Sequence, residues 1–228
     1  MLLLHGGLSH PISWFGQVPA LVAQGREVIL LATRGHGTSR TRNNIAGYWV
    51  YADDVKQLCD QLGLRTIPIV GWSDGGNTAL HFALRYPERL ERLVLISANY
   101  HFQGIDMTDA AGTAEASWRS WLRRCCLRLW LGNGPAGNVL IDNVQRLWAT
   151  QPELDAEQLR GIVHPVLSII GAIVCVSIAH NQSLTDLLTN ATPKTVDGAG
   201  HSAPITHAAE INQLITTFLA LPSEHRSE

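Results

Sequence analysis

Lysine is scarce in this chain, and neither sign of charge is in large excess. Only two of the 17 basic residues are lysines, Lys56 and Lys194, and the 19 acidic residues leave a net charge of −2. A surface this close to neutral lacks the basic excess that is typical of proteins that bind nucleic acid. We therefore predict no nucleic-acid partner.

Cysteine is also rare, and its spacing follows no known framework. The four cysteines match neither the paired spacing of a zinc site nor a regular set of disulfides; they are Cys59, Cys125, Cys126 and Cys175. Free cysteines of this kind fit a reducing compartment best. The sequence thus predicts a cytoplasmic protein with no metal site.

Long apolar runs and targeting signals are missing as well. Three leucines follow Met1, but no basic region and no small-residue cleavage site accompany them, so this is not the pattern of a signal peptide. The longest apolar run, residues 166–179, is too short to cross a bilayer and is typical of a buried strand with its continuation. We predict no membrane partner.

The most informative segment that is present is residues 67–76, which reads Ile-Pro-Ile-Val-Gly-Trp-Ser-Asp-Gly-Gly. An apolar β-rich run ends at Gly71, and a helical pattern begins at Gly75. A serine between such a strand and helix sits in strained backbone, and small neighbours let the chain turn there. The pattern predicts that the Ser73 hydroxyl is held out at the edge of a sheet. The Asp74 N–H, at the start of the helix, would point to where an oxyanion forms.

Strands and helices are predicted to alternate along most of the chain. Apolar runs predict strands over 2–4, 27–31, 67–70, 90–97, 165–170 and 194–196, and apolar periodicity predicts helices over 11–23, 49–62, 75–86, 183–189 and 207–219. Such alternation is typical of a mostly parallel, doubly covered sheet, the α/β class. The alternation stops between 100 and 160. We interpret that stretch as a helical cap over the carboxyl edge of the sheet, with residues 1–99 and 161–228 forming the core.

A late histidine completes a set of motifs. His201 lies at the end of the predicted loop 197–201 after the last strand, so the order along the chain is serine and then histidine. Four spaced motifs carry a resemblance to the α/β-hydrolase superfamily across nearly the whole chain: Leu4-His5-Gly6-Gly7, Arg34-Gly35-His36-Gly37, Gly71-Trp72-Ser73-Asp74-Gly75-Gly76 and Gly198-Ala199-Gly200-His201. The chain is most similar to the branch of esterases, lactonases and carbon–carbon hydrolases with a small cap. The resemblance implies the α/β-hydrolase fold, a doubly wound sheet with a small helical cap insertion.

The resemblance also implies roles for individual residues. Ser73 would be the nucleophile and His201 the general base. The oxyanion hole would combine the N–H of Asp74 with that of Gly7, and Leu8 is the alternative to Gly7. No cofactor and no metal are implied. A serine at this position also argues against dehalogenase and epoxide hydrolase chemistry, which would require a carboxylate there.

The third member of the triad is where the chain departs from its relatives. They place an aspartate after the strand near 166–170, in a pattern like Gly-x-x-Asp, and Val174 stands at that position here. Asn99 is a candidate to orient the histidine, although a neutral amide stabilises an imidazolium less than a carboxylate does. Asp106 and Asp109, at the start of the predicted cap, are the other candidates.

The amino-terminal part departs too. Relatives carry two more strands before the first strand predicted here, and these pair with the strand over 27–31. Without them that strand would be an apolar edge. Either the sequence is a shortened version or another chain covers the edge, and a homodimer would supply such a chain. The side chains of His5, Arg34 and His36 are interpreted as structural.

The sequence supports three hypotheses about function. The first is a hydrolase of a small-molecule ester, thioester or lactone that works through an acyl-serine and is weakened by the missing acid. Loss of the acid in a serine protease lowers kcat by roughly 10⁴, so residual catalysis is expected. The second is a non-catalytic protein that uses the same fold to bind a small ligand or a partner. The third is a defective copy that folds poorly.

Overall fold

A single parallel sheet forms the centre of the structure. The computed structural model describes residues 1–41, 43–105, 135–173 and 176–221. The strands run in the order β2-β1-β3-β4-β5-β6, and each neighbouring pair is parallel. Their bounds are β1 (Leu2–Leu4), β2 (Ile29–Leu31), β3 (Ile67–Trp72), β4 (Leu90–Ile96), β5 (Val166–Ile173) and β6 (Ala191–Gly200). The predicted α/β class and parallel sheet are confirmed.

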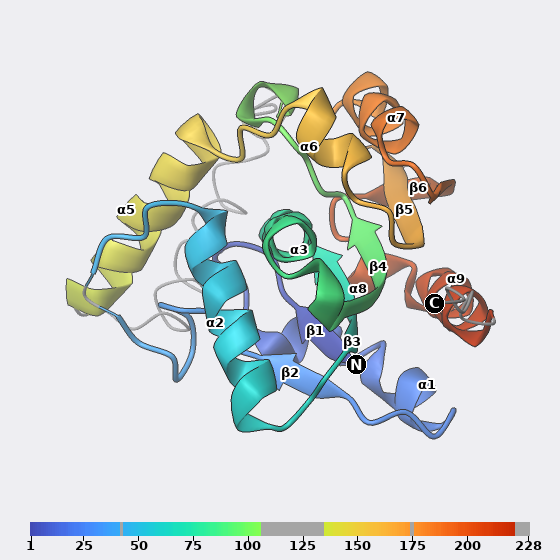
Figure 1. Ribbon diagram of the computed structural model, residues 1–228, viewed down its shortest axis with the longest axis horizontal. Coiled ribbons are helices and arrows are strands. Elements are labelled where there is room, and N and C mark those ends of the chain that lie inside the picture. The colour runs from blue at the N-terminus through green and yellow to red at the C-terminus, as the bar shows by residue number, and fades with distance from the viewer. Residues whose placement is uncertain (42, 106–134, 174–175, 222–228) are drawn as a thin grey trace.

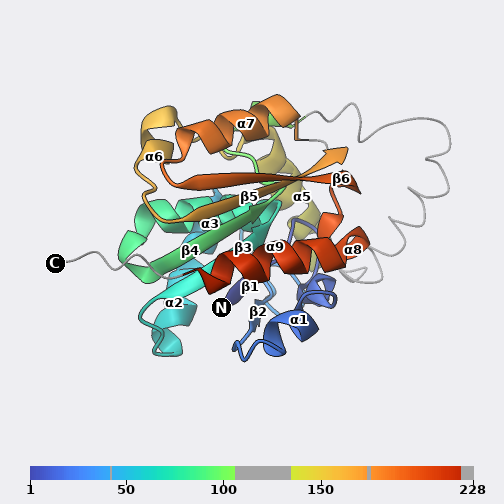
Figure 2. The same cartoon turned by 90° about the vertical axis from the view of Figure 1, so that its right-hand side faces the viewer.

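Helices cover both faces of this sheet (Figures 1 and 2). One face carries α2 (Tyr48–Gln61), α3 (Asp74–Arg85), α6 (Ala156–Arg160) and α7 (Ile178–Leu187). The other carries the 3₁₀ helix η1 (Pro11–Trp14), α1 (Val18–Val22), α8 (Ala203–Thr206) and α9 (Ala208–Ala220). A sheet that is covered in this way needs apolar residues on both faces.

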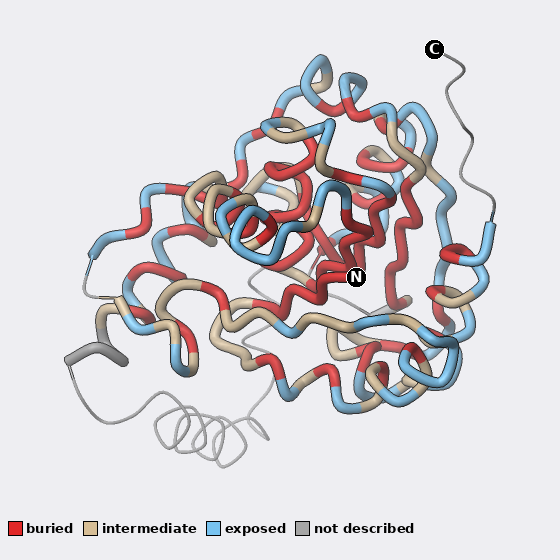
Figure 3. The backbone as a smooth tube through the Cα atoms, turned by 60° about the horizontal axis from the view of Figure 1, so that its bottom comes forward, coloured by how far each residue is buried: buried red, intermediate tan, exposed pale blue. Residues whose placement is uncertain are grey.

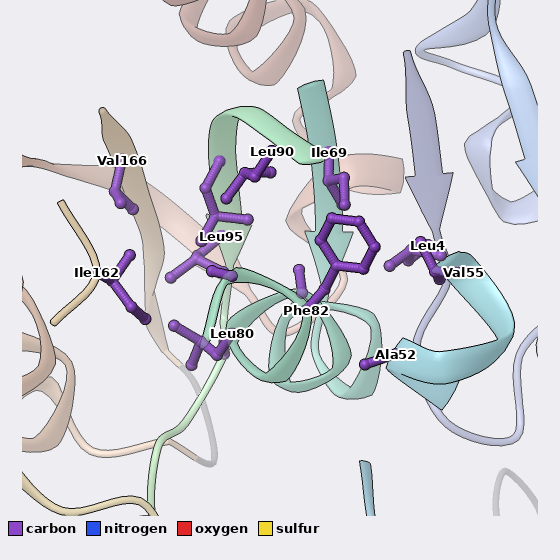
Figure 4. Close-up of a cluster of buried hydrophobic side chains, with 14 of the residues drawn as sticks. Leu4, Ala52, Val55, Ile69, Leu80, Phe82, Leu90, Leu95, Ile162 and Val166 are labelled. Carbon is purple, nitrogen blue, oxygen red and sulfur yellow. The ribbon is translucent and has the colours of Figure 1, made fainter. Parts of the chain in front are cut away.

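Neighbouring residues of each strand divide between the two cores, because side chains of a strand alternate in direction. Ile69 of β3 belongs to the core under α2 and α3, and its neighbour Val70 belongs to the core under α9. In the first core Phe82 of α3 points toward Ile69 and Leu4 (Figure 4). Figure 3 shows the same pattern along the chain, with buried strands inside half-exposed helices. Both cores hold the carboxyl ends of the central strands in fixed positions.

The outer strand β2 is less buried than the strands inside the sheet. Leu30, at its centre, is 41% exposed, whereas Leu3 of the neighbouring β1 is fully buried. The two strands are joined in register, and the Met1 amino group donates to the Glu27 carbonyl over 2.7 Å. The expectation that this strand lies at the edge of the sheet is confirmed by the strand order.

The helix predicted over 11–23 is wrong as a continuous element. The chain forms η1, turns, and begins again as α1. Pro19 lies in the first turn of α1, where its missing N–H costs nothing, but inside a longer helix it would break the hydrogen bonding. Gly16, in the turn, faces α9 closely, since an added Cβ would lie 3.0 Å from Ala208 Cβ.

The loop predicted over 197–201 is wrong for its first four residues, because β6 continues to Gly200 and the chain turns only at His201. The pairing of β5 with β6 shifts register between Gly171 and Ile173, which is the mark of a β-bulge. Gly198 has a φ of +68°, a conformation that glycine adopts readily. The glycines that suggested a loop instead allow a strand to bend directly before His201.

The described part of the predicted cap contains a 3₁₀ turn, η3 (Phe102–Gly104), a long helix, α5 (Pro135–Thr150), and α6. Helix α5 lies beside α2 (Figure 1). Leu147 packs with Tyr48 and Tyr51 of α2, and Asn143 accepts a hydrogen bond from the Ile45 N–H over 3.0 Å. Among the described helices none is both long and apolar enough to cross a membrane.

Helix α3 begins in direct contact with the backbone of the strands. A Cβ atom added to Gly75 would collide with the Leu4 carbonyl oxygen, and one added to Gly71 would lie 2.6 Å from the Gly76 Cα. Backbone atoms cannot move aside as the end of a side chain can. Both positions therefore require glycine, and Ser73 lies between them.

Replacing Gly75 with alanine is expected to lower the free energy of unfolding by about 3 kcal/mol, because the new Cβ overlaps main-chain atoms of β1. Gly161→Ala is the matched control, since Gly161 has a right-handed φ of −68° and its added Cβ would lie 3.2 Å from the Gln158 carbonyl oxygen. Urea unfolding of both variants tests the prediction. Equal stabilities of the two variants would contradict it.

Candidate functional site

Ser73 occupies the turn between β3 and α3 in strained backbone. Its φ of 54° and ψ of −121° lie outside the regions that side-chain-bearing residues favour. The Ser73 N–H donates to the Ile96 carbonyl over 2.8 Å, and its carbonyl accepts from Gly76 and Asn77 over 2.7 and 3.0 Å. Such a conformation costs on the order of 1–3 kcal/mol and persists only where the surroundings enforce it. The side chain is half-buried at the carboxyl end of the strand.

His201 comes to this region from the far end of the chain. It follows β6 directly, and its carbonyl accepts a 2.8 Å hydrogen bond from the Trp72 indole N–H. The centroids of the Trp72 and His201 rings are 6.0 Å apart. Trp72 immediately precedes Ser73, so the structure brings the predicted histidine beside the strand that carries the predicted serine.

The loop after β1 lies on the other side of Ser73. A Cβ atom added to Gly6 would lie 3.3 Å from Ser73 Cβ. One added to Gly7 would collide with the Asp74 carboxylate and would lie 3.1 Å from Trp148 Cζ2. The structure thus brings together three of the residues predicted for the site, Gly7, Ser73 and Asp74.

Leu8, the alternative to Gly7, has its N–H engaged elsewhere. It donates to Nε2 of His36 over 3.1 Å. The φ of Leu8 is 51°, a left-handed conformation that is uncommon for leucine. Because the Leu8 N–H is already bonded, Gly7 is the better placed of the two to bind an oxyanion.

A buried pair of histidines supports this loop from behind. His5 accepts from the Thr33 N–H at Nε2 over 3.2 Å, which leaves its Nδ1 to donate to the Gly6 carbonyl over 2.8 Å. His36 accepts from Leu8 at Nε2, so its Nδ1 donates to Thr33 Oγ1 over 3.0 Å. Both rings are therefore neutral, each with one defined tautomer. The structural roles expected for His5 and His36 agree with these contacts.

Burial explains why the two histidines stay uncharged. Burial, and to a smaller extent the nearby His36, lower the pKa of His5 to about 3. Burial likewise lowers the pKa of His36 to about 4, against hydrogen bonds to the backbone that act in the opposite direction. Protonation of His36 would turn Nε2 into a donor that faces the Leu8 N–H donor. The loop after β1 therefore depends on neutral histidines.

Asp74 has an unexpected partner in the described part of the predicted cap. Its side chain is 8% exposed, and both carboxylate oxygens accept from the Trp148 indole N–H of α5, over 2.9 and 3.1 Å. Burial raises the pKa of Asp74 to about 6, and the hydrogen bond from Trp148 opposes the rise. Nothing in the sequence pattern identifies Trp148, because its contact depends on how α5 packs.

Asn99 lies near the end of β4, and both the oxygen and the nitrogen of its amide form hydrogen bonds. Its Oδ1 accepts from Asn77 Nδ2 over 2.9 Å, and its Nδ2 donates to the His101 carbonyl over 3.0 Å. The Asn99 N–H also donates to Asn77 Oδ1, over 3.0 Å. The amide that was predicted to orient His201 is thus bonded to α3 and to the following chain.

Three other positions that bear on the acid lie outside the described residues. They are Val174, where the acid is expected, and the proposed substitutes Asp106 and Asp109. Arg34, read as structural, pairs with Asp54 of α2. In the part of the chain that the structure describes, no group of three or more histidine, cysteine, aspartate and glutamate side chains is arranged to hold a metal ion.

A hollow of about 280 Å³ opens beside the end of β2, and its lining includes Arg34, Thr33 and Tyr51. A smaller space of about 10 Å³ shares Thr33 and Tyr51 with it and lies against Gly7 and Asp74. Ser73 is in neither lining.

The histidine pair predicts how stability depends on pH. A histidine that is neutral in the folded state takes up a proton on unfolding, so its contribution is complete above its usual pKa of 6.5 and is lost as the pH falls toward about 4. We expect the free energy of unfolding to decline between about pH 7 and about pH 4, and the slope to fall by up to about 1.4 kcal/mol per pH unit in His36→Gln. Urea unfolding at several pH values measures the slope. The same slope in both proteins would contradict this account.

Comparisons with known proteins agree with the geometry. A family model described as alpha/beta hydrolase fold matches residues 1–133. Carboxylesterase YbfK of Bacillus subtilis (strain 168) is 28% identical over 239 residues, which cover 96% of this chain and 79% of YbfK. Two solved structures, each 22% identical to this chain, share the fold. The first is the enol-lactonase from Burkholderia xenovorans LB400, with a TM-score of 0.77; the alignment covers 96% of this chain and 90% of the lactonase. The meta-cleavage product hydrolase CumD from Pseudomonas fluorescens IP01 has a TM-score of 0.80, with coverages of 96% and 89%.

The matched residues make up more than half of the chain and include β1, the turn at Ser73 and the glycines around it. This chain belongs to the α/β-hydrolase family.

Proposed function

We propose that this protein hydrolyses a small ester, thioester or lactone through an acyl-serine intermediate at Ser73. The observation that carries the proposal is the strained turn that holds Ser73 between β3 and α3, with Gly7 and Asp74 against it. Strained backbone of this kind is concentrated at active sites, although not confined to them. The names of its relatives, a carboxylesterase and an enol-lactonase among them, support the substrate class.

In the first half of the reaction the Ser73 hydroxyl attacks the carbonyl carbon of the substrate. The His201 imidazole takes the hydroxyl proton as the new C–O bond forms. When the tetrahedral intermediate collapses, the bond to the leaving oxygen or sulfur breaks, and His201 returns the proton to it. Water then attacks the acyl-serine in the same way, which releases the acid and restores Ser73.

The tetrahedral oxyanion would be bound by two backbone N–H groups. One belongs to Asp74, which is the first residue of α3, where helix N–H groups have no partner within the helix. The other belongs to Gly7, because the neighbouring Leu8 N–H is bonded to His36. Removal of one such donor costs about 10²- to 10³-fold in kcat in enzymes of this type of chemistry.

We further propose that the activity is weaker than that of a full triad. Val174 stands where relatives carry the acid, and the Asn99 amide is bonded to Asn77 and His101. In a serine triad the carboxylate stabilises the imidazolium as it forms, so a valine at the usual position of the acid is expected to slow proton transfer. These two observations also favour the second candidate function, a non-catalytic protein that binds a small ligand at the same place.

Hydrolysis of p-nitrophenyl acetate by the purified protein and by Ser73→Ala tests the proposal. We expect a burst of p-nitrophenol followed by a slower steady release in the native protein, and loss of both phases above the uncatalysed rate in the variant. The matched control is Ser97→Ala, because Ser97 directly follows the neighbouring strand β4 with a similar φ of 51° but is buried. It is expected to keep both phases.

If the Ser73 variant hydrolyses the ester as fast as the native protein, the acyl-serine mechanism is wrong. Stabilisation of the native protein by the ester's acid or alcohol product, without a covalent adduct on Ser73 by mass spectrometry, would then favour the binding function.

A further inference from the structure

The contact between Asp74 and Trp148 has no role in the chemistry described above, although it lies next to the reacting groups. We propose that these two side chains act as a positioning pair that holds the Gly7 backbone, and with it the oxyanion-binding N–H, against the turn at Ser73. This inference rests on the proposed function. Asp74 would then serve the site twice, through its own N–H and through its side chain.

The first support is the way in which both side chains enclose Gly7. A Cβ atom added to Gly7 would collide with Asp74 Oδ2, and it would lie 2.9 Å from Asp74 Cγ and 3.1 Å from Trp148 Cζ2. The carboxylate and the indole ring therefore form one wall, and the glycine backbone lies directly on it. Any rotation of either side chain would change the space that Gly7 occupies.

The second support is that the pair is held together by a charge-assisted hydrogen bond. One indole N–H is shared by both carboxylate oxygens, over 2.9 and 3.1 Å, and the carboxylate is largely buried. Burial raises the pKa of Asp74 to about 6, so the group is still ionised at neutral pH. A buried carboxylate that lost this donor would be left poorly satisfied, at a cost of about 1–3 kcal/mol or more. The carboxylate would consequently turn or take up a proton.

The third support is that the loop is fixed on its other side as well. His36 holds the adjacent Leu8 N–H, so the chain at Gly7 is bounded by the histidine pair behind it and by the carboxylate and indole beside it. The space that remains between these groups is only about 10 Å³. The groups that face the carboxylate there are Tyr48 and Tyr51 of α2, with His5 and His36 lining the same space.

As a consequence, helix α5, which lies between β4 and β5 in the sequence, influences the site through the contact of Trp148 with Asp74, the residue after Ser73. Trp148 belongs to α5, which lies in the stretch that interrupts the strand and helix alternation. If α5 moves, the indole moves with it, and Gly7 loses one of its walls. Displacements of about 1 Å in catalytic geometry can cost roughly 100-fold in rate.

The test compares steady-state hydrolysis by the native protein and by Trp148→Phe. Phenylalanine keeps an aromatic ring but removes the indole N–H donor and the outer part of the indole that lies against Gly7. We expect the change to lower kcat by about 10- to 100-fold and to change KM by less than about threefold, because the oxyanion forms in the tetrahedral intermediate and its transition states and not in the bound substrate.

Trp49→Phe is the matched control, since Trp49 belongs to α2 and its ring contacts the ring of His81. It is expected to leave kcat and KM unchanged. An unchanged kcat in Trp148→Phe would overturn the positioning pair.

Failure of the proposed function would look different. In that case the native protein itself would show no turnover that depends on Ser73, whatever residue stands at position 148.

The affinity for a competitive boronic acid, which forms a tetrahedral adduct with a serine, gives a second measure of the positioning pair. We expect this affinity to fall in Trp148→Phe by the same factor as kcat, and an unchanged affinity would count against the pair.

Discussion

The contact of Gly75 with the Leu4 carbonyl oxygen is the constraint on which the rest of the site depends. Because the Gly75 Cα rests on the backbone of β1, helix α3 begins at the sheet surface and not above it. The turn that joins β3 to α3 must therefore be tight, and Ser73 takes up the strain with a φ of 54°. The same contact places the loop after β1 beside Ser73, since Gly6 follows Leu4 by two residues. One close approach of two backbones thus brings the hydroxyl and the loop together.

A site made of backbone groups needs side chains that hold the backbone still, and here these side chains are polar and buried. Burial of a polar group without a partner is costly, so each one is stable only in the arrangement that satisfies it. His36 is satisfied only with its proton on Nδ1 toward Thr33 and its Nε2 toward Leu8. Asp74 is satisfied by the Trp148 indole. The cost of breaking these contacts is what makes the loop rigid, and it makes the loop sensitive to acid.

The sequence predicted the parts of this arrangement that local patterns determine. The strand, serine turn and helix at 67–86 could be predicted because glycine spacing and apolar periodicity agree there. The continuous helix over 11–23 and most of the loop over 197–201 were wrong, since Pro19 can begin a second helix and Gly198 can lie in a bent strand as readily as in a loop. Trp148 could not be predicted at all. Its contact with Asp74 joins residues 74 positions apart, and only the packing of α5 on α2 brings them together.

The Asn77–Asn99 pair holds the Asn99 amide in place at the end of β4. The two residues exchange hydrogen bonds between α3 and the chain after β4, and both are buried. Turning the Asn99 amide toward His201 would leave Asn77 without that partner, at a cost of about 1–3 kcal/mol. Esters with a good leaving group need little protonation of that group, whereas alkyl esters need an imidazolium to deliver its proton. In the proposed mechanism, a weakened triad would therefore slow the hydrolysis of alkyl esters more than that of activated esters.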